Sequence, residues 1–97
     1  MTQSFFTVTF TFENYADSDS ESNTWRTIFT SIDDAKAEVL KSVAVQIEED
    51  AEYDIPQLDP NPEFQSSVIE GDLWIELDNG SVYNVWTIQK AELFVKE

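Results

Sequence analysis

The chain has 97 residues, which suits one hydrophobic core but not two. Its 41% hydrophobic and 13% aromatic content separates it from disordered chains, although its net charge is -15. Twenty acids against five bases all but exclude direct binding to DNA, RNA or an anionic membrane, because such binding needs basic residues to neutralise phosphates. We expect one acidic domain over residues 1–97, with a positively charged partner: a basic protein, a cation, or a protein surface that normally holds nucleic acid.

The sequence contains no cysteine, so it has neither a disulfide framework nor a thiolate metal site. The N-terminal segment MTQSFF lacks the positive charge that opens a signal peptide. No apolar run approaches the length that spans a membrane. We therefore expect a cytoplasmic protein.

The first segment of the chain predicts two paired strands. Apolar residues alternate with threonines over Phe5–Glu13, and a period of two is typical of a half-buried strand. A polar loop is expected over Asn14–Asn23, followed by an antiparallel second strand over Thr24–Thr30. The face of the first strand that we expect to be buried carries Phe6, Val8, Phe10 and Phe12.

A long amphipathic helix is predicted over residues 31–54, SIDDAKAEVLKSVAVQIEEDAEYD. Ser31 is a favourable N-cap, and Asp33 and Asp34 lie in the first turn, where negative charge is stabilising. Apolar residues at spacings of three and four form one stripe that should face the core. This stripe comprises Ile32, Ala35, Val39, Leu40, Val43, Ala44 and Ile47.

The second half of the chain predicts further strands. The proline-containing segment Ile55–Glu63 favours an extended connector, and a short strand follows within Phe64–Ile69. Asn79-Gly80 favours a type I′ hairpin turn, which would place Leu77 opposite Val82. A separate last strand is expected over Glu92–Lys96. The fold class is then α+β: a single antiparallel sheet of four to six strands, in the order β-β-α-β-β-β, with one long helix packed on one face.

The end of the predicted helix carries an acidic cluster. Negative charge there faces the negative end of the helix dipole, and like charges at helical spacing repel one another. A sequence that breaks a local rule repeatedly in one place is a functional-site candidate, although a charge run is more often simply solvated. The residues in question are Glu48, Glu49, Asp50, Glu52 and Asp54.

Asp17, Asp19 and Glu21 form a second candidate, with acids at alternate positions. A calcium-binding EF-hand loop would continue with Gly and Glu where this chain has Ser22 and Ile28, so no metal site is predicted. In an extended segment, alternate side chains point the same way about 6.6 Å apart. That separation is of the same order as neighbouring phosphates on one nucleic-acid strand. These acids could therefore occupy a phosphate-binding groove, or simply line a solvated loop.

Catalysis is not expected. The chain has no His and no Cys, which removes the usual proton shuttle and thiol nucleophile, and two glycines cannot form a glycine-rich phosphate loop. No cofactor is predicted. Tyr15 and Tyr53 each adjoin an acidic cluster, and aromatic residues are common anchors at interfaces.

The chain resembles the small phage-encoded anti-CRISPR proteins, in particular a type I-F inhibitor that acts as a DNA mimic. The resemblance rests on chain length, net charge, the opening TVTFTFENYADSDSESNTWRT and the predicted helix. It implies binding to the basic target-duplex site of a type I-F crRNA-guided surveillance complex, on its large subunit and next to the crRNA backbone subunits. The residues alone leave open an acidic adaptor or chaperone-like module for another basic protein.

Overall fold

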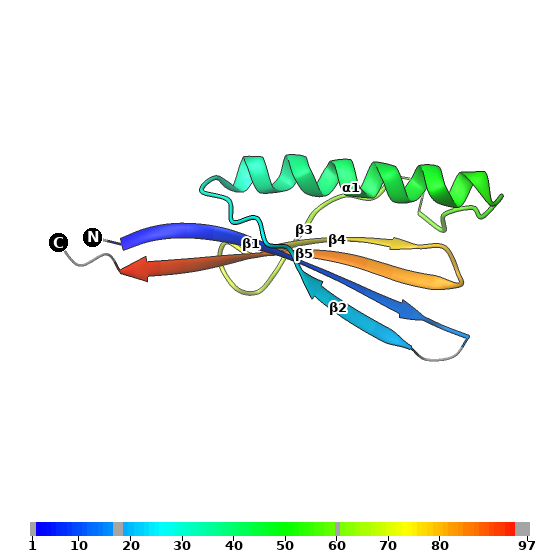
Figure 1. The fold of residues 1–97 in the computed structure, drawn as a ribbon, viewed down its shortest axis with the longest axis horizontal. Helices are drawn as coiled ribbons and strands as arrows, with labels where there is room; N and C mark the ends of the chain where they lie inside the picture. Colours follow the sequence, from blue (N-terminus) through cyan, green and yellow to red (C-terminus); the bar gives the residue numbers. More distant parts are fainter. Residues whose placement is uncertain (1, 17–18, 60, 95–97) are drawn as a thin grey trace.

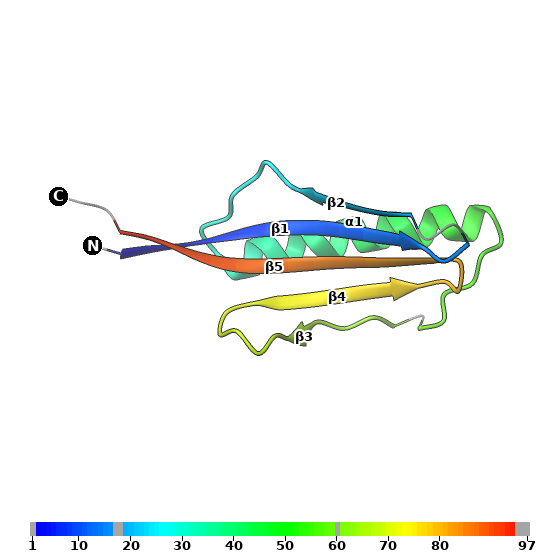
Figure 2. The ribbon, with the colours of Figure 1, turned by 90° about the horizontal axis from the view of Figure 1, so that it is seen from below.

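The computed structural model describes residues 2–16, 19–59 and 61–94. In chain order the elements are β1 (Thr2–Asn14), β2 (Ser20–Thr24), α1 (Ile32–Glu52), β3 (Gln65–Ser66), β4 (Leu73–Asp78) and β5 (Val82–Phe94). The strands form one antiparallel sheet of five strands in the spatial order β2-β1-β5-β4-β3, with α1 along one face (Figure 1, Figure 2). This confirms the predicted α+β class with one antiparallel sheet and a single helix. No helix among the described residues is both long and apolar enough to cross a membrane.

The core lies between α1 and the central strands β1, β5 and β4. The predicted alternation of β1 is confirmed, because Val8 is fully buried and lies opposite Ile88 of β5. Phe10 lies opposite Trp86, with their ring centroids 4.9 Å apart. The buried core residues are Phe6, Val8, Phe29, Ala35, Val39, Val43, Ile75, Leu77, Trp86 and Ile88.

The helix begins as predicted, because the Ser31 hydroxyl accepts a hydrogen bond from the Asp33 N–H at 3.2 Å. Its buried stripe is narrower than the sequence pattern suggested. Leu40 and Ala44, which were assigned to the core, are exposed. A helix that rests on one flat sheet, with no second layer beside it, buries only the arc that touches the sheet.

The second strand lies earlier in the chain than predicted. It is β2, which begins at Ser20 because the Asn14 N–H donates to the Asp19 carbonyl at 2.7 Å and closes a tight hairpin. The predicted strand over Thr24–Thr30 is wrong. That segment leaves the sheet edge to reach the helix layer. It contacts β1 through the Trp25 N–H, which donates to the Val8 carbonyl at 2.8 Å, and through the isolated Phe6–Phe29 bridge.

The hairpin between β4 and β5 has a different register from the predicted one. Leu77 lies opposite Asn84, not Val82, and the Asn79 N–H donates to the Val82 carbonyl at 3.3 Å. Gly80 has φ of 85° but Asn79 does not have positive φ, so the type I′ assignment is wrong. The Asn79 side chain is the reason, since its Oδ1 accepts the Val82 N–H at 2.7 Å and keeps Asn79 ahead of the turn.

The two short strands that were expected on either side of this hairpin have different outcomes. β3 lies within Phe64–Ile69 but spans only Gln65–Ser66. The separate strand predicted over Glu92–Lys96 is wrong over its described residues, because β5 runs unbroken from Val82 to Phe94. Continuous pairing with β1, up to Thr2 opposite Phe94, keeps this long strand intact.

Candidate functional site

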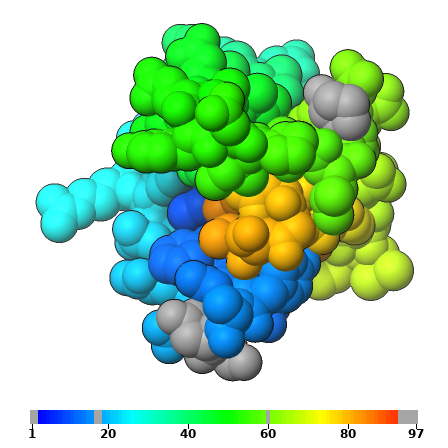
Figure 3. Space-filling model, turned by 90° about the vertical axis from the view of Figure 1, so that its right-hand side faces the viewer, coloured from blue at the N-terminus to red at the C-terminus, as the bar shows by residue number. Residues whose placement is uncertain are grey.

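Three segments far apart in the sequence meet at one end of the molecule: the C-terminus of α1, the β1–β2 hairpin and the β4–β5 hairpin (Figure 3). The Tyr15 N–H donates to the Ser81 carbonyl at 3.0 Å, which joins the two hairpins. The Asn79 side-chain amide donates to Asp50 at 3.3 Å, which joins the second hairpin to α1. We call this region the acidic end. Its carboxylates are those of Glu13, Asp19, Glu21, Glu48, Glu49, Glu52, Asp54 and Asp78.

The chain reverses direction sharply after α1, and this turn fixes where the helix acids lie. Asp54 has φ of 57°, a left-handed conformation that Asp tolerates better than most residues. Its N–H donates to the Ala51 carbonyl at 3.1 Å, and the Ile55 N–H donates to the Asp50 carbonyl at 2.9 Å. These two bonds form a Schellman motif, the common C-terminal cap of helices.

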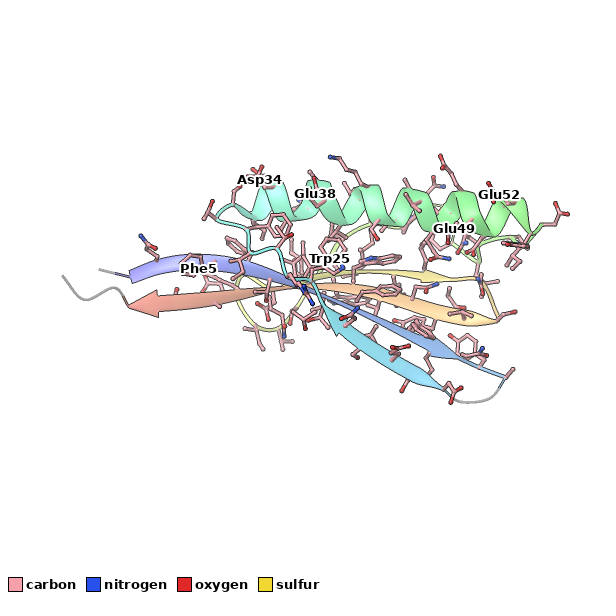
Figure 4. The ribbon with its side chains drawn as sticks, viewed as in Figure 1. Phe5, Trp25, Asp34, Glu38, Glu49 and Glu52 are labelled. Atoms are coloured by element: carbon pink, nitrogen blue, oxygen red, sulfur yellow. The ribbon has the colours of Figure 1, made fainter. Side chains whose placement is uncertain are left out.

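The surface of the last turns of α1 is acidic without local compensation. Glu48, Glu49 and Glu52 are exposed, and the last turn contains no basic residue (Figure 4). Tyr53, one of the two predicted aromatic anchors, is the C-cap and is 76% exposed. The unfavourable interaction of these acids with the helix dipole therefore persists in the folded chain.

Asp50 corrects one of the site predictions. Only 7% of this residue is exposed, so it cannot meet a partner as a surface charge. Its carboxylate accepts hydrogen bonds from three side-chain amides: Gln46 at 3.1 Å, Asn79 at 3.3 Å, and Gln57. A buried carboxylate needs such donors, because burying an unpaired charge is costly. Asp50 faces the sheet, and it serves the structure of the acidic end.

The second candidate cluster lies in the β1–β2 hairpin, and those of its acids that the structure describes are exposed. Asp19 and Glu21 lie two residues apart on an extended segment and therefore point to the same side. Glu21 lies opposite Phe12 of β1, which places it on the side of the sheet that carries α1. Asp17 lies outside the described residues.

Sequence reasoning did not assign the acids on the uncovered face of the sheet. There the Tyr15 hydroxyl donates to Asp78 at 3.0 Å, and the Tyr83 hydroxyl donates to Glu76. Burial and the bond to Glu76 raise the pKa of Tyr83 to about 12. Burial and the bond to Asp78 also raise the pKa of Tyr15. The contact between Tyr15 and Asp78 joins residues 63 positions apart in the chain, so no local sequence pattern could have found it.

Ion pairing leaves most of this charge uncompensated. Across residues 2–16, 19–59 and 61–94 there are two ion pairs, Lys41 with Glu38 at 3.0 Å and Lys90 with Glu92 at 3.5 Å. Neither pair belongs to the acidic end. In the same residues no three carboxylates converge as a set of metal ligands. Chemically, this surface can attract cationic groups of a partner.

A small apolar hollow lies at the opposite end, where β1 and β5 extend beyond α1. It is lined by Phe5, Thr7, Ile28, Ala91 and Glu92. Its single carboxylate does not form the acid–base pair that hydrolytic chemistry uses. Comparisons with known protein families, with curated proteins and with solved structures find no match.

Proposed function

We propose that this chain is an anti-CRISPR inhibitor that mimics DNA. Its acidic end binds the basic target-duplex site of a type I-F crRNA-guided surveillance complex and blocks DNA recruitment. The partner surface is formed by the large subunit and the neighbouring crRNA backbone subunits, in the cytoplasm of an infected bacterium. The inhibitor acts by occupancy, with no catalysis, metal or cofactor.

The observation that supports this proposal is the assembly of exposed carboxylates from α1 and the β1–β2 hairpin at one end, beside the half-buried Asp78 of the β4–β5 hairpin. Among the described residues, none of them forms an ion pair with a basic residue of the chain. A groove that holds duplex DNA is lined with Lys and Arg, and their charge is neutralised by phosphates. Glu48 and Glu52 lie about 6 Å apart along the helix axis, a spacing of the same order as that of neighbouring phosphates. Opposite charges also steer association, so binding should be fast at low salt and slower as salt rises.

Two double variants with equal change in net charge test the proposal. Glu49→Gln/Glu52→Gln neutralises the acidic end, and Glu63→Gln/Glu70→Gln neutralises exposed acids elsewhere. These two control acids lie away from the acidic end. Glu63 precedes Phe64, whose ring lies under Lys36 near the start of α1. Glu70 precedes Gly71, which packs against Lys90. We expect the first variant to bind the purified complex at least about tenfold more weakly and with less salt dependence.

The control variant should bind as the wild type does. The free energy of unfolding of both variants should lie within about 0.5 kcal/mol of that of the wild type, because the substituted side chains are exposed. Binding is measured on a biosensor across ionic strength, together with displacement of target duplex. If both variants weaken binding equally, net charge alone would explain the effect and the acidic end would have no special role. Binding that leaves duplex recruitment intact would favour the adaptor function.

A further inference from the structure

The outer face of α1 is divided into three zones along its length. Acids occupy the first turns, up to Glu38, and the last turns, from Glu48. The stretch between them, residues 39–47, contains no carboxylate. Glu48 comes ten positions after Glu38, so the two acidic zones are about 15 Å apart along the helix.

The middle zone exposes apolar side chains that the core does not use. Leu40 is 47% exposed and Val45 is 54% exposed. Ala44 is exposed as well, and the one charged residue of this stretch is Lys41, which is paired with Glu38. At about 100° per residue, Leu40 and Val45 are about 140° apart, so they lie on the two flanks of the outer face of α1, with Ala44 and Lys41 between them. We call Leu40, Ala44 and Val45 the apolar middle of α1.

Single exposed apolar residues are ordinary on protein surfaces. Here three lie within six consecutive residues of one helix, in a chain of net charge -15, between two groups of acids. Apolar patches with a polar rim mark interaction sites, and interface anchors are typically apolar side chains surrounded by polar contacts that exclude water. A second copy of the chain does not fit this surface, because it would bring acids against acids.

We infer that the outer face of α1 is an interaction surface for a protein with an apolar patch between two basic clusters about 15 Å apart. The two acidic zones meet the basic clusters, and the apolar middle covers the patch. This inference rests on the proposed function, and it adds a contact that duplex DNA cannot make. The partner therefore holds the inhibitor more tightly than charge alone allows, and this added affinity persists at high salt.

The purified type I-F surveillance complex is the first probe. Leu40→Gln/Val45→Gln removes the apolar contact, keeps net charge and does not lower helix propensity, because Gln is as favourable in a helix as Leu and more favourable than Val. Val68→Gln/Ile69→Gln is the matched control, because it changes two exposed apolar residues away from α1 in the same way. We expect the α1 variant to bind about tenfold more weakly, through faster dissociation, with an unchanged salt slope and melting temperature. The control should bind as the wild type does.

The outcomes separate this inference from the proposed function. If Leu40→Gln/Val45→Gln binds normally while Glu49→Gln/Glu52→Gln loses binding, the surface on α1 is overturned and DNA mimicry by the acidic end stands. If only the α1 variant loses binding, the apolar contact stands, whereas DNA mimicry and the pairing of the last acidic zone with a basic cluster both fall. An equal loss in the α1 variant and in Val68→Gln/Ile69→Gln would also overturn the inference.

A second probe does not depend on that complex. It is a synthetic helical peptide whose two lysine clusters lie about 15 Å apart around leucines, together with the same peptide carrying serines instead. Titrated into the isotope-labelled chain, the leucine peptide should bind more tightly and shift the amide signals of Leu40 and Val45. Leu40→Gln/Val45→Gln should abolish this difference. Equal binding of both peptides to the wild type would overturn the inference.

Discussion

Two carboxylates are buried among the described residues, one near each end of β4, and they are held in different ways. Asp50, at the acidic end, accepts hydrogen bonds from three side-chain amides that come from α1, from the connector after it and from the β4–β5 hairpin. Asp72, at the opposite end, accepts one backbone hydrogen bond, from the Lys90 N–H at 2.9 Å. Asp50 therefore joins three segments, whereas Asp72 completes the end of a strand pair.

The difference between them shows which acids can act on a partner. Pairing of β4 with β5 ends at Leu73 opposite Ile88, so the next β5 amide that points this way, that of Lys90, would have no strand partner. The Asp72 carboxylate takes the place of that partner. Both buried acids are explained by donors within the chain. The exposed acids at the acidic end have no such explanation, which leaves them free to meet a basic surface.

The largest expected effect comes from Asp50→Ala. It leaves the amides of Gln46, Gln57 and Asn79 without their acceptor in a partly buried site. Unsatisfied buried donors are costly, so the free energy of unfolding should fall by about 2–4 kcal/mol. Partner affinity should fall as well, because α1 and the hairpins lose their fixed arrangement. Urea unfolding and a biosensor measure the two quantities.

Asp50→Asn is the near-isosteric control for this prediction. It keeps one acceptor oxygen and should lie between Asp50→Ala and the wild type in stability. If the free energy of unfolding of Asp50→Ala instead lies within about 0.5 kcal/mol of that of the wild type, Asp50 behaves as an ordinary surface acid. Its role in joining the segments would then be refuted.

A smaller effect is expected from Asp72→Ala. It removes one charge-assisted hydrogen bond to the Lys90 N–H, which should lower the free energy of unfolding by about 1–2 kcal/mol. Affinity for the partner should not change, because this site lies at the other end of β4 from the acidic end. A loss of affinity comparable with that of Asp50→Ala would show that the two ends are not independent. The same two measurements decide this.

The smallest effect is confined to alkaline pH. The pKa of Tyr83 is raised from 10.0 to about 12, so the folded chain holds this proton more tightly than the unfolded chain does. The stability that this provides is complete below pH 10.0 and is lost as pH rises toward about 12. Tyr83→Phe should flatten this part of the stability profile. Denaturant unfolding across that range measures it, and equal slopes in both proteins would contradict the assignment.

Sequence reasoning located the strongly periodic elements. The alternation in Phe5–Glu13 and the capped helix after Ser31 depend on neighbours within a few residues, and both are observed. The β4–β5 register was missed because the Asn79 side chain hydrogen-bonds the Val82 N–H in place of the type I′ geometry that Asn-Gly favours. The second strand was misplaced because the segment after Thr24 must leave the sheet to reach α1.

For the candidate site, too, some features follow from the sequence and others only from the tertiary structure. The amino-acid sequence by itself determined the net charge, the concentration of acids after the helix, and the α+β class, since all of these follow from composition and local periodicity. Only the tertiary structure decided that Asp50 is buried, that Leu40 is exposed, and that Tyr15 and Asp78 lie together. Burial depends on which elements pack against one another, and contacts between distant segments such as Asn79 and Asp50 form only when the whole chain is folded.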